Sequence, residues 1–124
     1  MNFCISVHCL DGRVQEPVIK YLKENYIVSY VDTITEAGPI KIISENKEKS
    51  AIDSIIEKIN ISIKIHGSKV IAVSGHYDCA GNPVDEKVQR KQIRLSIKNL
   101  KKYFPGIQIV GLWINNEWKV NKVV

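Results

Sequence analysis

The chain has 124 residues, which fits one ordinary domain with a real hydrophobic core, so residues 1–124 are expected to fold as a single unit. Hydrophobic residues make up 44% of the sequence and charged residues 25%, values typical of soluble globular proteins that exclude intrinsic disorder and fibrous classes. The formal net charge of +5 is dispersed along the chain without a nucleic-acid-binding motif, so no nucleic-acid partner is expected.

The first half of the chain alternates predicted strands and helices. Residues 3–9 mix apolar and small side chains and stop before Asp11, which predicts a buried strand followed by a turn. Pro17 suits a first helical position and apolar residues recur on one face after it, which predicts a helix over about residues 15–25. The β-branched and aromatic run 26–31 predicts a second strand, which a loop follows.

The second half repeats this alternation. Isoleucines at helical spacing predict a helix over about residues 48–65, and the apolar run 69–75 predicts a third strand. A further helix is expected over residues 85–104, where a Pro-Gly pair ends it, and a strand over 107–114. Residues 118–124 could add a short edge strand of either direction.

Strands that alternate with helices of this length predict βαβ units. We therefore expect an α/β fold, a three-layer sandwich with a mostly parallel central sheet of four to five strands. Functional sites in such folds lie at the carboxyl ends of the strands. Cys9 ends the first predicted strand, and His76 and Cys79 follow the third. If these strands are neighbours, the three side chains meet at one edge of the sheet.

Cys9, His76 and Cys79 are residue types that zinc prefers. Two thiolates and one imidazole leave a fourth position free, which is the usual pattern of a catalytic zinc site. The alternative is that Cys9 is a small core thiol and His76 a loop histidine satisfied by hydrogen bonds. Asp11 and Arg13 favour the metal, because they add a carboxylate and a guanidinium beside Cys9, although a turn aspartate and a surface arginine remain an alternative for them.

Cysteine usage and the N-terminal residues bear on the compartment. Three cysteines cannot all pair within one chain, and the first residues lack the charged lead and long apolar run of a secretory signal. A reducing cytoplasm is therefore expected. No apolar run approaches the roughly 18 to 20 residues that a helix needs to cross a bilayer, so no membrane partner is expected.

Two separated motifs, Cys-x-Asp-x-Arg at Cys9, Asp11 and Arg13 and His-x-x-Cys at His76 and Cys79, together resemble the signature of the β-class carbonic anhydrases. Their order and the β/α alternation agree with that family over nearly the whole chain. The resemblance implies a zinc ion on Cys9, His76 and Cys79, and a zinc hydroxide that attacks carbon dioxide to give bicarbonate. It implies that Asp11 either accepts a hydrogen bond from that hydroxide or takes the fourth zinc position, and that Arg13 holds Asp11 away from the metal. It also implies a homodimer or higher homo-oligomer.

The chain departs from that family in three places, one of which is Ala80, where the family commonly has a glycine directly after His-x-x-Cys. Only eight residues precede Cys9, where the family carries a helical arm, and Thr35 and Glu36 stand where it has arginine and asparagine. Two alternatives thus remain open: a non-catalytic zinc-binding module of the same fold, or a zinc hydrolase acting on a related small molecule such as carbonyl sulfide. A thiol enzyme with Cys9 as nucleophile is less favoured, because acidic Asp11 would repel an oxyanion substrate such as phosphate.

Four further residues have expected roles near these motifs or elsewhere. His8 should point to the face of the strand opposite Cys9, which favours a packing or supporting role over metal ligation. Asp78 is expected to shape the ligand loop, to orient His76 or to form an Asx turn. Cys4 is expected to be a core thiol, and His66 to face solvent at the end of a helix.

Overall fold

The computed structural model describes residues 2–124 of the chain. Its elements in chain order are β1 (Phe3–Cys9), α1 (Gly12–Tyr26), β2 (Tyr30–Glu36), α2 (Pro39–Glu45), α3 (Lys49–His66), β3 (Val70–His76), α4 (Glu86–Tyr103), β4 (Gln108–Ile114) and β5 (Val120–Lys122). They form one five-stranded sheet in the order β2, β1, β3, β4, β5. The first four strands are parallel, and β5 runs antiparallel beside β4. The predicted α/β class with a mostly parallel sheet is confirmed.

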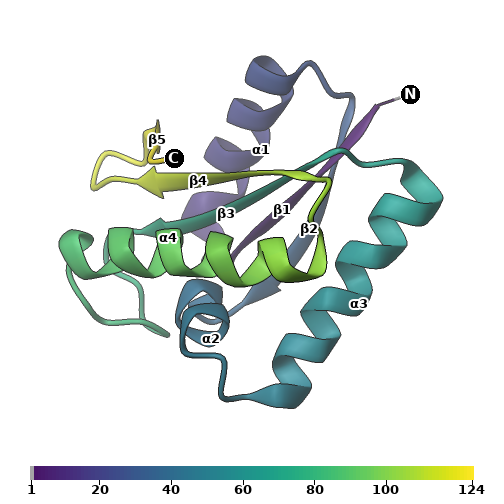
Figure 1. Ribbon diagram of the computed structural model, residues 1–124. Helices are drawn as coiled ribbons and strands as arrows, with labels where there is room; N and C mark the ends of the chain where they lie inside the picture. The colour runs from purple at the N-terminus through teal and green to yellow at the C-terminus, as the bar shows by residue number, and fades with distance from the viewer. Residues whose placement is uncertain (1) are drawn as a thin grey trace.

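Helices cover both faces of the sheet (Figure 1). Helix α1 lies on one face, and α2, α3 and α4 lie on the other. Strands β1 and β3 are buried along nearly their whole length because both of their faces are covered. On one face Val18 and Leu22 of α1 pack against Cys4, whereas on the other face isoleucines from the three remaining helices pack against Ile5 and Val73. Cys4 is thus a core residue, as expected.

The pairing of β1 with β3 positions the functional residues. These two strands are parallel neighbours, with Val7 opposite Val73. Their carboxyl ends therefore lie at the same edge of the sheet, and Cys9 and His76 are the last residues of the two strands. The prediction that the two chemical motifs meet there is confirmed at the level of the backbone.

Helix α1 begins earlier than the sequence predicts. It starts at Gly12 because Asp11 caps it, with the Asp11 side chain accepting a hydrogen bond from the Arg13 backbone amide at 2.9 Å. Pro17 lies inside the helix instead of at its first position. The predicted start at residue 15 is therefore wrong, and Arg13 belongs to the first turn of a helix. That turn orients the arginine toward the edge of the sheet where Cys9 lies.

The strand predicted at residues 26–31 is also displaced. Strand β2 spans Tyr30–Glu36, and Tyr26 is the last residue of α1. The side chains of Tyr26 and Val28 pack against the core cluster on the α1 side of the sheet, so their apolar character does not mark a strand. Strand β2 lies at the edge of the sheet, and Ile34 is its one buried residue. Its sequence therefore carries only a weak apolar pattern.

Helix α2 was not predicted, because its seven residues, which include the buried Ile40 and Ile43, are too few for a periodic pattern. The helices predicted at 48–65 and 85–104 are confirmed to within one residue.

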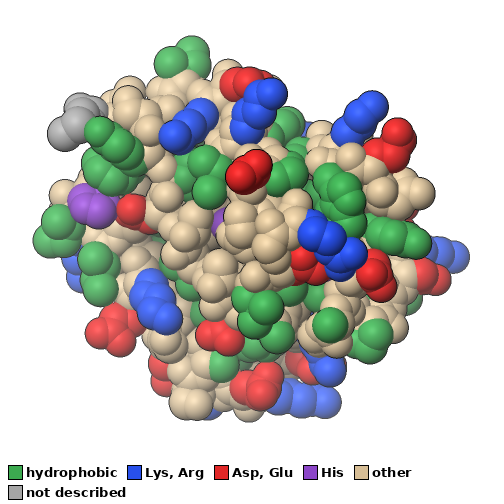
Figure 2. Space-filling view, turned by 180° about the vertical axis from the view of Figure 1, so that it is seen from behind, with side chains coloured by type: hydrophobic (Ala, Val, Ile, Leu, Met, Phe, Trp, Pro, Cys, Tyr) green, Lys and Arg blue, Asp and Glu red, His purple; other side chains and the backbone are tan. Residues whose placement is uncertain are grey.

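Charges of both signs are mixed on the surface. On the face seen in Figure 2, lysine and arginine side chains are interspersed with aspartate and glutamate and do not gather into one patch. Over residues 2–124, none of the helices combines the length and the apolar character that crossing a membrane requires.

Candidate metal centre

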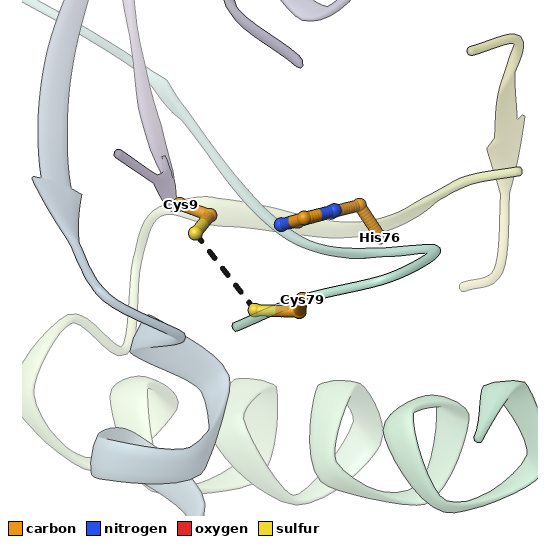
Figure 3. Close-up of side chains that lie close together, drawn as sticks. All are labelled: Cys9, His76 and Cys79. Carbon is orange, nitrogen blue, oxygen red and sulfur yellow. Dashed lines mark hydrogen bonds between the residues drawn. The ribbon is translucent and has the colours of Figure 1, made fainter. Parts of the chain in front are cut away.

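Three potential ligand atoms converge at the carboxyl edge of the sheet (Figure 3). Cys9 ends β1, His76 ends β3, and Cys79 lies in the loop that follows β3. The two sulfur atoms are 3.8 Å apart, and the ligand atoms of all three residues lie within 4.8 Å of one another. All three side chains are buried. The structure thus brings together the three residues that the sequence selects as metal ligands.

The hydrogen bonding of His76 leaves one ring nitrogen available. Its Nδ1 lies 2.7 Å from the Tyr77 carbonyl oxygen, which can only accept, so Nδ1 carries the proton and donates. The Nε2 atom then presents a lone pair, and it is buried without a hydrogen-bond partner among the described residues. A buried acceptor without a partner is costly in free energy, and a metal ion on Nε2 would remove that cost.

The sulfur atoms also suit zinc. Two thiolates bound to one tetrahedral zinc ion at about 2.3 Å each lie roughly 3.8 Å apart. The separation between Cys9 and Cys79 has this value. One imidazole and two thiolates complete three of four tetrahedral positions. The donor set and its spacing therefore fit a zinc ion with one open position.

The two thiols share one hydrogen bond. Either sulfur can be the donor, and the bond to Cys79 holds the pKa of Cys9 well below its usual range, although burial opposes this shift. The same contact and burial raise the pKa of Cys79. For His76, burial alone would lower the pKa, but contact with Cys9 and the Tyr77 carbonyl outweighs it and the pKa is raised. The site thus already favours one thiolate, and a metal that binds both sulfurs must displace the second proton.

Asp11 and Arg13 form a two-pronged ion pair beside the ligands. Arg13 Nη2 donates to Asp11 Oδ2 at 2.7 Å, and Arg13 Nε donates to Oδ1 at 3.1 Å. These bonds lower the pKa of Asp11 to about 2, despite partial burial that would raise it. The carboxylate is therefore ionised at neutral pH and held in one orientation.

Arg13 also contacts the loop that carries two of the ligands. Its Nη1 lies 3.3 Å from Asp78 Oδ2, and its Nη2 lies 3.2 Å from the Asp78 carbonyl oxygen. The guanidinium carbon of Arg13 lies over the Trp118 ring, 4.4 Å from its centre. Asp78 thus pairs with Arg13, a contact that the sequence does not indicate. Trp118 was not identified as part of the site; an isolated tryptophan in a charged segment was the one available signal.

Gln15 of α1 forms hydrogen bonds with the backbone of the Cys-x-Asp-x-Arg motif. Its Nε2 donates to the carbonyl oxygens of Cys9 and Asp11, both at 2.8 Å. Its Oε1 accepts from His8 Nε2 at 2.6 Å, and His8 Nδ1 accepts from the Ser6 hydroxyl at 2.6 Å. His8 thus supports the site from the opposite face of β1, as predicted.

Gln89 holds the backbone of the other motif. It accepts from the His76 amide at 3.1 Å and donates to the His76 carbonyl at 2.9 Å. Gly75 makes room for it, because a Cβ atom there would lie 2.5 Å from Gln89 Oε1 and 2.7 Å from Ile40 Cδ1. Neither glutamine was identified from the sequence, where each reads as one polar residue in a helix.

His66 is exposed as expected, but it also makes a contact that the sequence does not indicate. Its Nδ1 lies 2.6 Å from Asp32 Oδ2, and its ring stacks on Phe3 with the centroids 4.0 Å apart. This cluster belongs to the opposite, amino-terminal edge of β1 and takes no part in the candidate metal centre.

The fold and the cluster define an α/β protein with cysteine and histidine side chains able to bind a metal at the carboxyl edge of a mostly parallel sheet. A family model described as "Putative carbonic anhydrase" matches residues 1–124, so the chain belongs to this carbonic anhydrase family. No curated protein matches the chain.

Several solved structures share the fold. A carbonic anhydrase from Glaciozyma antarctica aligns with a TM-score of 0.62 at 18% identity, over 97% of this chain and 81% of that one. The β-carbonic anhydrase CcaA gives a TM-score of 0.65 at 14% identity, over 98% and 80%. A tetrameric β-carbonic anhydrase from Sordaria macrospora gives 0.54 at 14%, over 95% and 79%. The expected relationship to the β-class enzymes is confirmed.

Proposed function

We propose that this chain is a zinc-dependent carbonic anhydrase that converts carbon dioxide to bicarbonate, with Cys9, His76 and Cys79 as the metal ligands. The observation that carries the proposal is the buried His76 Nε2, which has no hydrogen-bond partner in the described chain and lies within 4.8 Å of both sulfur atoms. Membership of the carbonic anhydrase family supports the reaction class.

Each residue of the site has a distinct part in this proposal. A bound zinc ion supplies Lewis acidity that lowers the pKa of a water ligand from about 15.7 to about 7. Cys9 and Cys79 would hold the ion as thiolates, and the bond from His76 Nδ1 to the Tyr77 carbonyl fixes the ring that presents Nε2.

Asp11 and Arg13 act beside the ligands. Asp11 is ionised and follows Cys9 by two residues, so it would offer a hydrogen-bond acceptor to a water held by the bound ion. Arg13 occupies one lone pair on each Asp11 oxygen, which makes the carboxylate a weaker competitor for the metal.

We also propose that the chain functions as one domain over residues 1–124 and assembles into homo-oligomers. The Sordaria macrospora proteins that share its fold are tetrameric, which supports self-association. Light scattering coupled to size-exclusion chromatography measures the assembled mass directly. A mass of two or more chains is expected, and a single-chain mass at all accessible concentrations would contradict self-association.

The reaction is tested by metal analysis and stopped-flow carbon dioxide hydration on the same preparations. Wild-type protein should contain about one zinc ion per chain and catalyse hydration. Cys79→Ala should lose both zinc and hydration, whereas Asp11→Ala should retain zinc and lose about 10²-fold or more in hydration rate. Cys4→Ala and Asp53→Ala are matched controls away from the site and should retain both properties.

Other results would select among the alternatives. Zinc without hydration between pH 7 and 9 would exclude the carbonic anhydrase and favour a non-catalytic zinc module. Zinc with hydrolysis of carbonyl sulfide but not hydration of carbon dioxide would favour the related hydrolase. A wild-type protein that binds no zinc would contradict the proposal entirely.

A further inference from the structure

Trp118 has an unusual backbone conformation in the turn that joins β4 to β5. Its φ is +61°, in the left-handed region that bulky side chains rarely adopt. Asn115 holds this turn: its Oδ1 accepts from the amides of Glu117 at 2.9 Å and Lys119 at 3.0 Å, and its carbonyl accepts from the Trp118 amide at 2.9 Å. A turn that keeps a tryptophan in a strained conformation indicates that the position of its ring matters.

That ring lies over Arg13. The guanidinium carbon is 4.4 Å from the ring centroid, within the range of a cation–π contact. The ring also packs against the core cluster that contains Cys9 and Cys79, and its centroid lies 6.4 Å from that of His76. Trp118 therefore packs beside the candidate metal centre and lies over an arginine whose side chain is 46% exposed.

A guanidinium that lies over an indole ring can still donate hydrogen bonds from its N–H groups. Arg13 uses these donors on Asp11, two residues after Cys9, and on Asp78, which lies between His76 and Cys79. One guanidinium thus connects the two segments that carry all three candidate ligands. An exposed arginine alone makes weak ion pairs because ordering its side chain costs entropy, and the ring reduces that cost.

We infer that Trp118 is a positioning residue of the metal centre, which holds Arg13 so that Arg13 keeps the two ligand-bearing segments together. This role rests on the proposed function, because it concerns the retention of a metal ion. It differs from ordinary core packing in one respect. A packing residue stabilises the chain whether Arg13 is present or not, whereas a positioning residue acts on the metal only through Arg13.

A double-mutant cycle on zinc release tests this role. Zinc-loaded wild type, Trp118→Leu, Arg13→Met and the double variant are mixed with excess chelator, and the rate of zinc transfer is followed. Trp118→Leu should release zinc about tenfold faster, and the double variant should match Arg13→Met. Trp118→Phe, which keeps an aromatic face, should recover most of the loss. Tyr103→Leu is the matched control, because it replaces an exposed aromatic residue at the end of α4, and it should release zinc at the wild-type rate.

Unchanged release in Trp118→Leu, or effects that multiply independently of Arg13, would overturn the role. A second readout is the NMR signal of the Arg13 Nε–H group in the metal-free protein. This signal is assigned as the one that disappears in Arg13→Met. The signal should be sharp in wild type and broadened by exchange in Trp118→Leu. If wild type binds no zinc, the proposed function fails, and this signal still decides the role of Trp118, because an unchanged signal would overturn it.

Discussion

The sulfur atoms of Cys9 and Cys79 lie 3.8 Å apart, although the two residues are 70 positions apart in the chain. Parallel pairing of β1 with β3 brings their segments together, and the loop after His76 turns Cys79 back toward the sheet. This separation matches that of two thiolates on one tetrahedral zinc ion, roughly 3.8 Å. The fold therefore prepares the ligand set, and groups that hold the two segments should control metal affinity.

Gln15 is one such group. Gln15→Met keeps the length of the side chain but removes its hydrogen bonds to Cys9, Asp11 and His8. We expect zinc affinity to fall by about 10-fold to 100-fold, as is typical when a supporting partner of a ligand is lost. Competition with a chromophoric chelator measures this affinity. Gln108→Met, at the exposed start of β4, should bind zinc as wild type does. Equal affinities in all three proteins would contradict the assigned role of Gln15.

Gly75→Ala should destabilise the fold at the base of the site. The added methyl group would lie 2.5 Å from Gln89 Oε1 and 2.7 Å from Ile40 Cδ1, so the ends of both side chains must move. Overpacking of this kind typically costs about 1–3 kcal/mol. Urea denaturation of the metal-free protein should show this loss in the free energy of unfolding. Gly106→Ala is the control, because no heavy atom lies within 4 Å of its added carbon. Equal losses in the two variants would refute the steric account.

Cys4 should make the protein sensitive to alkali. Burial, and secondarily the charge of Asp32, raises the pKa of Cys4 from 9.0 to about 11. The folded state thus favours the protonated thiol. Its contribution to stability is complete below pH 9 and is lost as the pH rises toward 11. A shift of this size corresponds to about 2.7 kcal/mol at most.

Urea denaturation of wild type and Cys4→Ala between pH 8 and pH 11 checks this prediction. The free energy of unfolding should fall more steeply with pH in wild type than in the variant, because the other titrating groups are common to both proteins. Parallel pH profiles would show that the Cys4 thiol titrates alike in the folded and unfolded states.

Strong periodic patterns explain why most of the fold could be predicted. β1 and β3 are buried on both faces, and α3 and α4 each repeat apolar residues over 18 positions, so their sequences carry clear signals. Helix α2 and edge strand β2 lack such signals because one is short and the other is only half covered. Misplacing β2 did not affect the predicted site, which depends on the two central strands.

The candidate ligands could be chosen from residue type and position at strand ends, but their supporting groups could not. Gln15 and Gln89 look like ordinary polar residues of helices, and their roles depend on contacts with backbone atoms of other elements. Trp118 lies over Arg13 in a turn where its own φ is positive, and no spacing in the sequence encodes that geometry. Such three-dimensional contacts set the environment of the site.

The most direct test of the proposed zinc centre is X-ray absorption at the zinc K edge of protein purified with zinc. We expect two sulfur ligands at about 2.3 Å and nitrogen or oxygen ligands at about 2.0–2.1 Å, in total four-coordinate. His76→Ala and Cys9→Ser each remove one of the three ligands, so both variants should lose the bound zinc and with it this signal, as is expected of Cys79→Ala. Zinc bound without sulfur ligands, or a wild-type protein that retains no zinc, would contradict the assignment of Cys9, His76 and Cys79 as a metal centre.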